Sequence, residues 1–280
     1  LGLEVDVLTH KGALLLVGEQ GVGDTLQFLR YVSVLVASGC QVSLCLPQRL
    51  HRLVQASMEG VEVVSPDHVR EHSSGDWLSL LSLPLFLAES PAHPLVQTPY
   101  LFVDDSQAAI WNERLCETQD LIVALNWQGN PSAENGTLKG RSLSLQAFEP
   151  LAAVESVRFL SLQKGFGSDQ LQSCTFHDRF VDCQNLIDET WDFSEVSAIL
   201  ASTDLVITSD TAIAHLSGAI GHPTWLLLHH LPDWRWGLEG DTTFWYPSMR
   251  LFRQREPGNW DEVMQRVASA LKEFVAERSY

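Results

Sequence analysis

Short runs of apolar residues alternate along this chain with longer stretches in which apolar residues recur at helical spacing. In the first half, compact apolar runs predict buried strands at residues 13–17, 41–46 and 61–65. The periodic stretches 24–38 and 48–57 predict helices that bury one face. Alternation of this kind is typical of an α/β protein.

The middle of the chain is less regular. Residues 66–99 contain several prolines and little periodicity, which predicts loops and short pieces. Residues 105–117 predict a helix, and we place the domain boundary near 116–120. The predicted domains are therefore a short N-terminal one over 1–117 and a C-terminal one over 118–280.

The second half of the chain repeats the alternation of short apolar runs and periodic stretches. Its patterns predict strands at 121–127, 157–162, 204–208 and 224–228, and helices at 145–153, 193–202, 211–220 and 260–277. Two successive α/β halves indicate two Rossmann-like domains that face a cleft. Ligands of parallel sheets bind at the carboxyl ends of the strands, so the loops that follow each strand are where a site is expected.

Charge narrows the class of ligand. The chain has 280 residues, 45% of them hydrophobic, and carries 18 Lys and Arg against 35 Asp and Glu, a formal charge of −17. A surface this acidic repels nucleic acids and anionic lipids, so we expect neither as a partner. A small phosphorylated ligand is compatible with it, because a helix N-terminus and one or two cations bind such a group locally.

The number and spacing of the cysteines indicate the redox state of the cellular compartment. They stand at residues 40, 45, 116, 174 and 183. Their number is odd and they form no C-x-x-C motif, which predicts reduced thiols in a cytoplasmic protein. No transmembrane run or signal peptide is visible. Because the sequence begins with Leu1, we expect it to be part of a longer protein with a preceding N-terminal domain.

The first candidate motif is the loop Gly18-x-x-Gly21-x-Gly23, followed by Asp24, between the first predicted strand and helix. Glycines there permit a close approach of the backbone. The spacing is neither that of a dinucleotide fingerprint nor that of a P-loop. Asp24 has two interpretations at this stage: it caps the helix, or it is a general base on the floor of the cleft that deprotonates an acceptor hydroxyl.

The second motif, residues 208–215 (TSDTAIAH), joins a predicted strand to a helix that begins at Thr211. Free N–H groups of the first helical turn, including that of Ala212, form an anion site. Asp210 is placed to accept from sugar hydroxyls, and His215 lies on the same helix face as Thr211. The alternative is an ordinary helix cap with a half-buried histidine.

Three further loops contain polar or aromatic candidates. Lys164 follows a predicted strand and is placed to reach a diphosphate, unless it is a solvated loop lysine. Asn126, at the carboxyl end of a predicted strand, and Arg141 are candidates to hold phosphate or sugar, although the Gly-Asn-Pro between them is a strong turn signal. Arg235 and Trp236 lie in an aromatic segment that either covers a ligand or packs the domain interface.

Metal chemistry is not indicated. The sequence contains no H-E-x-x-H, no paired-cysteine motif and no Asp-x-Asp. We therefore predict no metal and no cofactor.

Together these segments are similar to the heptosyltransferase-like glycosyltransferases, and more closely to the glycosyltransferase-like domain that follows tetratricopeptide repeats in bacterial proteins. The matches span nearly the whole chain in family order, and GVGD and DTAIAH are the most specific. They are GEQGVGDTLQFLR (18–30), NWQGNP (126–131), SLQKG (161–165), DLVITSDTAIAHLSGAIG (204–221), DWRW (233–236), WYP (245–247) and RLFRQ (250–254).

The resemblance implies a GT-B fold and metal-independent, inverting transfer from a nucleotide-diphosphate sugar. It implies that Asp24 is the base and that Lys164 contacts the diphosphate. The donor-binding turn of the family corresponds to Asp210, Thr211 and His215, and we carry Arg141 and Trp236 over as well. The first half departs from the family. It is short, and residues 66–99 replace acceptor-binding structure, so neither a lipopolysaccharide acceptor nor heptose specificity is expected.

We therefore expect a glycosyltransferase that acts on a glycan or protein acceptor, fused to an N-terminal repeat domain. Two alternatives stay open. One is a non-catalytic module that binds a nucleotide sugar within a larger repeat protein, and the other is a nucleotide-sugar epimerase on the same fold.

Overall fold

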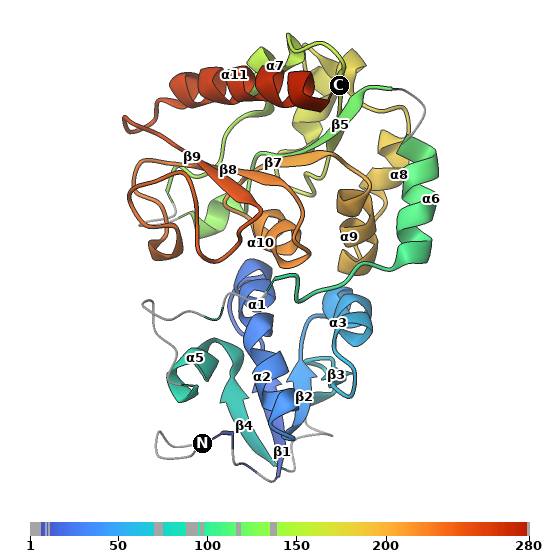
Figure 1. Ribbon diagram of the computed structural model, residues 1–280, viewed down its shortest axis with the longest axis vertical. Coiled ribbons are helices and arrows are strands. Elements are labelled where there is room, and N and C mark those ends of the chain that lie inside the picture. The colour runs from blue at the N-terminus through green and yellow to red at the C-terminus, as the bar shows by residue number, and fades with distance from the viewer. Residues whose placement is uncertain are drawn as a thin grey trace.

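The computed structural model describes residues 7–8, 10, 12–69, 75–87, 95, 98–115, 119–134 and 139–278. Two parallel sheets lie one above the other along the long axis (Figure 1), with strand orders β3-β2-β1-β4 and β6-β5-β7-β8-β9. The strands are β1 Ala13–Val17, β2 Gln41–Cys45, β3 Glu62–Val64, β4 Asp76–Ser79, β5 Leu121–Asn126, β6 Val157–Ser161, β7 Leu205–Ser209, β8 Thr224–Leu228 and β9 Met249–Arg253. The two predicted α/β halves are confirmed.

Short helices surround both sheets, and one long helix ends the chain. They are α1 Val22–Phe28, α2 Val32–Ala37, α3 His51–Ser57, α5 Leu83–Phe86, α6 Asp105–Leu115, α7 Glu149–Ala152, α8 Gln184–Asp188, α9 Phe193–Ala201, α10 Ala212–Ala219 and α11 Trp260–Arg278. In the second domain, α7 and α11 cover one face of the sheet and α9 and α10 the other (Figure 1). Because both faces are covered, every residue of β7 and β8 is buried.

The helix predicted over 24–38 has a different start in the structure and is divided in two. It begins at Val22, and a 3₁₀ turn at Leu29–Tyr31 divides it into α1 and α2. The N-cap is Gly21, and Asp24 is the third helical residue, whose carboxylate accepts the Gly21 N–H at 3.2 Å. Two strands were not predicted: β4, which lies in the stretch predicted as loops and short pieces, and β9.

The chain crosses between the domains just before α6. The N–H groups of Tyr100 and Leu101 donate to the carbonyl of Ala219 in the second domain. Helix α6 packs against α9, and the Ser202 hydroxyl donates to the Ala108 carbonyl at 3.1 Å. The predicted division, between residues 117 and 118, lies outside the described residues. Helix α6, on the N-terminal side of that division, packs with the second domain.

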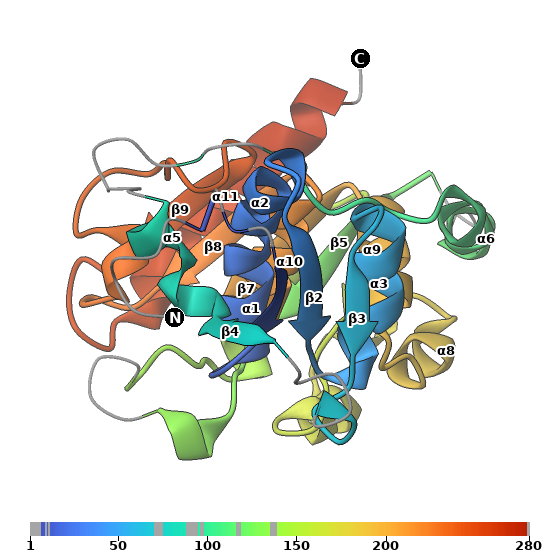
Figure 2. The ribbon, with the colours of Figure 1, turned by 90° about the horizontal axis from the view of Figure 1, so that it is seen from below.

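The two domains meet where α1 lies against α10, as Figure 2 shows from below. Gly23 permits this contact, because a Cβ there would lie 2.9 Å from the His215 ring. Beside it, the guanidinium of Arg30 is fully buried and donates to the carbonyls of Gln27 and Trp245 at 2.9 and 3.1 Å. One hydrophobic cluster continues from the first domain into the second, so the domains share a core.

Two smaller findings concern the predictions. Cys40, Cys45 and Cys174 are free thiols, and Cys116 lies outside the described residues. Of the helices that the structure describes, none has the length and apolar character needed to span a bilayer.

Candidate functional site

A cavity of about 480 Å³ opens between the domains at the carboxyl ends of β5, β6 and β7. This volume lies within the usual range of small-molecule sites, roughly 300–1,000 Å³. Almost all the predicted site residues line it. They are Gly21, Gly23, Asp24, Asn126, Arg141, Lys164, Asp210, Thr211, Ala212, His215 and Arg235. The remaining one, Trp236, is buried beside the cavity and stacks on His215 with ring centroids 5.4 Å apart.

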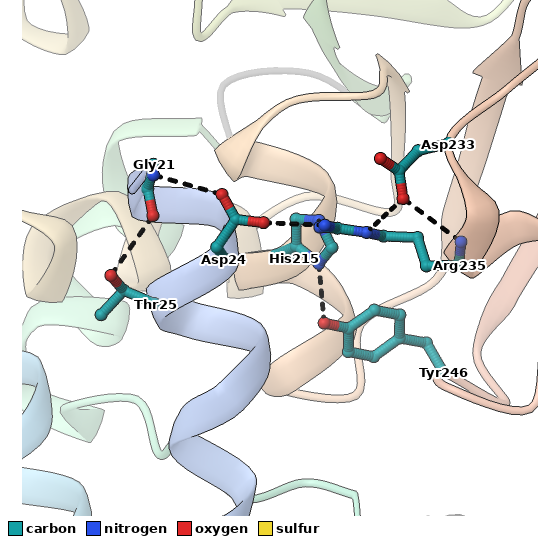
Figure 3. Close-up of polar contacts among 7 residues, drawn as sticks. All are labelled: Gly21, Asp24, Thr25, His215, Asp233, Arg235 and Tyr246. Atoms are coloured by element: carbon teal, nitrogen blue, oxygen red, sulfur yellow. Dashed lines mark hydrogen bonds and ion pairs between the residues drawn. The ribbon is translucent and has the colours of Figure 1, made fainter. Parts of the chain in front are cut away.

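Asp24 and Arg235, which both line the cavity, form an ion pair between the two domains (Figure 3). Oδ1 of Asp24 accepts from Nη2 of Arg235 at 2.7 Å, while Oδ2 of Asp24 accepts the N–H of Gly21. One oxygen thus caps the start of α1 and the other meets the second domain. Asp233 accepts from Nε of Arg235 at 2.8 Å. Burial lowers the pKa of Arg235, but the carboxylates of Asp233 and Asp24 outweigh it and raise that pKa overall.

His215 is neutral, and both its ring nitrogens are engaged (Figure 3). A guanidinium has no acceptor atom, so Nη1 of Arg235 donates to Nε2 of His215 at 3.2 Å. The ring proton therefore lies on Nδ1, which donates to the Tyr246 hydroxyl at 2.8 Å. Burial, with nearby Arg235 and Arg30, lowers the pKa of His215 well below its ordinary value.

The start of α10 faces the cavity. Thr211 is the N-cap, and no side chain caps the first turn. The Thr211 hydroxyl instead donates to Oδ1 of Asn126 at 2.7 Å. Backbone N–H groups of this turn, at Ala212 and Ile213 in the cavity wall, form the type of site that binds anions. Asp210 is buried beside it; burial raises the pKa of its carboxyl, and Arg235 opposes that shift.

Gln163, to which the sequence reasoning gave no role, organises the loops around the cavity. Its Oε1 accepts from the Asn126 amide and from the backbone N–H groups of Trp127 and Gln128, each at 3.0–3.1 Å. Its Nε2 donates to the carbonyls of Gln128 and Phe166. The signal was its place in a loop directly after a strand, next to Lys164.

The cavity is locally cationic in an acidic protein. Its lining contains four cationic side chains, Arg49, Arg141, Lys164 and Arg235, and three carboxylates, Asp24, Asp210 and Asp233. Lys164 is half-buried, and its ammonium group donates to the Ile187 carbonyl. Desolvation lowers the pKa of Lys164, although Asp188 and Glu195 act against it.

Several lining residues were not predicted. Arg49 reaches the cavity from the first domain and lies over the Phe193 ring, 5.6 Å from its centroid. Phe166 and Trp191 also line the cavity, and each is more than half exposed. Within the described part of the chain, no group of three or more His, Cys, Asp or Glu side chains is arranged to hold a metal ion.

Comparison with known proteins shows that the sequence of this chain has a distant relative. No family model matches the chain. It is 27% identical over 290 residues to Protein FlbA of Caulobacter vibrioides, in an alignment covering 94% of this chain and 47% of FlbA. The chain therefore spans about half the length of the curated relative that it matches.

Solved structures define the fold. A protein from Veillonella parvula, described as a glycosyl transferase of family 9, has a TM-score of 0.67 and 9% identity, covering 99% of this chain and 100% of its own. The E. coli ADP-heptose LPS heptosyltransferase II has a TM-score of 0.64 and 13% identity, covering 96% and 100%. The chain therefore has the GT-B fold that was predicted, with two Rossmann-like domains facing a cleft.

Proposed function

We propose that this protein is a glycosyltransferase that moves a sugar from a nucleotide-diphosphate sugar to a hydroxyl group of a glycan or protein acceptor, with inversion and without a metal ion. One observation carries the proposal. Asp24 of the first domain and the anion site of the second, formed by the start of α10 and Lys164, line the same cavity.

The diphosphate is assigned to the second domain. The first turn of α10 offers uncapped N–H groups, and the helix dipole favours a negative charge there. Lys164 and Arg141 line the same cavity and are placed to add positive charge. These groups stabilise the leaving diphosphate as the glycosidic bond breaks, which is the task that a divalent ion performs in other enzymes.

Asp24 is assigned as the base. Its carboxylate lines the cavity, paired with Arg235, and is placed there to take the proton of an acceptor hydroxyl. The acceptor oxygen attacks the anomeric carbon and gives its proton to Asp24. The bond from that carbon to the diphosphate oxygen breaks, and the nucleoside diphosphate leaves with the electron pair. A single in-line displacement inverts the anomeric centre.

The comparisons support this assignment through fold alone. Of the structures with the same fold, one is described as a glycosyl transferase of family 9 and one as an ADP-heptose LPS heptosyltransferase. The sugar, the acceptor, a preceding repeat domain and a cytoplasmic location stay predictions from the sequence. The half of FlbA that this chain does not span leaves room for a further domain in that relative.

The test is release of nucleoside diphosphate from a panel of sugar nucleotides with UDP, GDP, ADP, CDP or dTDP as the nucleotide, using water or a cell extract as acceptor source. Turnover that persists in EDTA is expected for one nucleotide. Binding of a nucleotide without turnover favours the non-catalytic module. Conversion of the sugar without any acceptor favours an epimerase.

A further inference from the structure

A chain of hydrogen bonds leads away from the Asp24 carboxylate into the second domain. Arg235 donates to Asp24 and to Nε2 of His215, and Nδ1 of His215 donates to the Tyr246 hydroxyl. Each direction is fixed, because an arginine only donates and a neutral imidazole has one donor and one acceptor nitrogen. The chain therefore admits a single tautomer of His215.

The chain of hydrogen bonds returns to helix α1, which carries Asp24. The Tyr246 hydroxyl lies 3.5 Å from that of Tyr100, and the Tyr100 hydroxyl donates to the Leu26 carbonyl at 3.0 Å. Leu26 is two residues after Asp24 in α1. The result is a closed ring that starts at the side chain of Asp24, passes through the second domain and returns to the backbone of α1.

The imidazole at the centre of this ring has little room to move. Trp236 stacks on it, Tyr246 meets it edge-on with centroids 5.8 Å apart, and Gly23 closes the third side. His215 is only 2% exposed. Its two polar atoms are both bound to protein, so it presents no free hydrogen-bonding nitrogen to a ligand.

Arg235 keeps donors to spare. Each of its three nitrogens donates to protein, to Asp233, His215 and Asp24. A guanidinium has five N–H groups, so these three contacts leave two N–H groups over, and Arg235 itself lines the cavity. The same guanidinium is thus able to contact a bound ligand while it holds Asp24.

We propose that His215 and Tyr246 are positioning residues that act through Arg235 to fix the Asp24 carboxylate at the cleft. This inference rests on the proposed function, because it takes Asp24 as the base. It gives His215 a role different from the donor contact that the family resemblance implies. Asp24 needs this support because its own helix belongs to one domain and the donor site to the other.

The first experiment does not depend on activity. In ¹⁵N NMR spectra of the full chain labelled on histidine, His215 is expected to have its proton on Nδ1 and to remain neutral between pH 6 and 8. The variant Arg235→Gln is expected to shift the Nε2 resonance. A proton on Nε2 would overturn the inference while leaving the proposed function untouched, because Arg235 would then have no acceptor there.

The second experiment separates positioning from ligand contact. It compares release of nucleoside diphosphate with the dissociation constant of the same nucleotide in His215→Phe, His215→Gln and Tyr246→Phe. His215→Phe keeps a ring but loses the acceptor, so turnover is expected to fall about 10²-fold, with the dissociation constant changed less than about twofold. His215→Gln restores an acceptor and is expected to recover part of the turnover.

His222→Gln is the matched control, since His222 is a histidine of the same domain outside the cavity lining. It is expected to match the wild type in both measurements. If His215→Phe does not fold, Tyr246→Phe makes the same test by removing one oxygen. Unchanged turnover, or affinity lost in proportion to turnover, would overturn the positioning role. A wild type that neither binds nor turns over any nucleotide would instead remove the proposed function.

Discussion

Nη2 of Arg235 lies 2.7 Å from Oδ1 of Asp24, although 211 residues separate the two along the chain. Among the ion pairs of the described residues, this is the one that joins the two domains. The two side chains are 12% and 22% exposed, so water screens the pair only partly. The placement of the carboxylate inferred to be the base therefore depends on both domains.

Replacing Asp24 by asparagine is expected to abolish most of the turnover while nucleotide binding persists. The amide keeps an acceptor for Arg235 but has no basicity, and the donor site lies in the other domain. The loss should be about 10²–10⁴-fold, the usual contribution of a general base. Release of nucleoside diphosphate and calorimetric titration of the nucleotide measure the two quantities.

The control for this substitution is Asp67→Asn, at an exposed aspartate of the first domain that does not line the cavity. It should retain full turnover. If Asp24→Asn turned over as fast as the wild type, Asp24 would not be the base.

Lys164→Met is expected to weaken nucleotide binding by about 10- to 100-fold. A hydrogen bond to a charged group contributes about 1.5–3 kcal/mol, and 1.4 kcal/mol corresponds to tenfold. Burial lowers the pKa of Lys164. As the pH rises, its ammonium group should therefore lose its charge, and the wild type its affinity for nucleotide, at a lower pH than an exposed lysine would. Lys272→Met, on the exposed side of α11, is the control. Equal affinity of both variants would exclude Lys164 from the diphosphate site.

Gly23→Ala tests the contact between α1 and α10. The added methyl would lie 2.9 Å from the His215 ring, and overpacking of this kind costs about 1–3 kcal/mol. Chemical denaturation should show this loss in Gly23→Ala and a smaller one when the same change is made in His215→Ala, where the ring is gone. The same loss in both backgrounds would mean that the two residues are not in contact.

Stability is expected to fall in mild acid. Burial, with Arg278 nearby, lowers the pKa of His222 from 6.5 to about 4. Between these values the unfolded chain binds a proton at this residue and the folded chain does not, so stability is present above pH 6.5 and lost as the pH falls towards 4. One histidine with this pKa shift contributes about 3 kcal/mol to the free energy of unfolding above pH 6.5.

Denaturant titrations of the wild type and His222→Gln between pH 4 and 7.5 measure this effect. His222→Gln should lose less stability than the wild type as the pH falls over this range. The slope of its free energy of unfolding against pH should be smaller by the equivalent of about one bound proton. The remaining slope includes His215, whose pKa is also lowered. Identical slopes in the two proteins would show that His222 is protonated equally in the folded and unfolded chains.

Much of the fold could be predicted because buried parallel strands are short, apolar and sharply bounded. β1 and β8 have the predicted limits, since polar residues or turns follow each run. β4 could not be found in this way. It has four residues, and Trp77 within it is 61% exposed, so it carries no apolar run.

The candidate site could be predicted where sequence order fixes position. Asn126 is the last residue of β5, and Lys164 and Asp210 follow β6 and β7. The ends of these parallel strands meet at one edge of the sheet. Tyr100 and Tyr246 could not be predicted, because their roles depend on contacts between residues that lie far apart in the chain. Arg49 was missed for the same reason: no local pattern shows that it reaches across the cleft.

The most direct test of the donor site is the melting temperature of the full chain with UDP, GDP, ADP, CDP and dTDP, each in EDTA and in magnesium. A ligand at about 100 times its dissociation constant stabilises a protein by about 2.7 kcal/mol. We predict that one nucleotide raises the melting temperature equally in EDTA and magnesium, and that Lys164→Met removes the shift. No shift with any nucleotide, or a shift that requires magnesium, would contradict a metal-independent diphosphate site in this cavity.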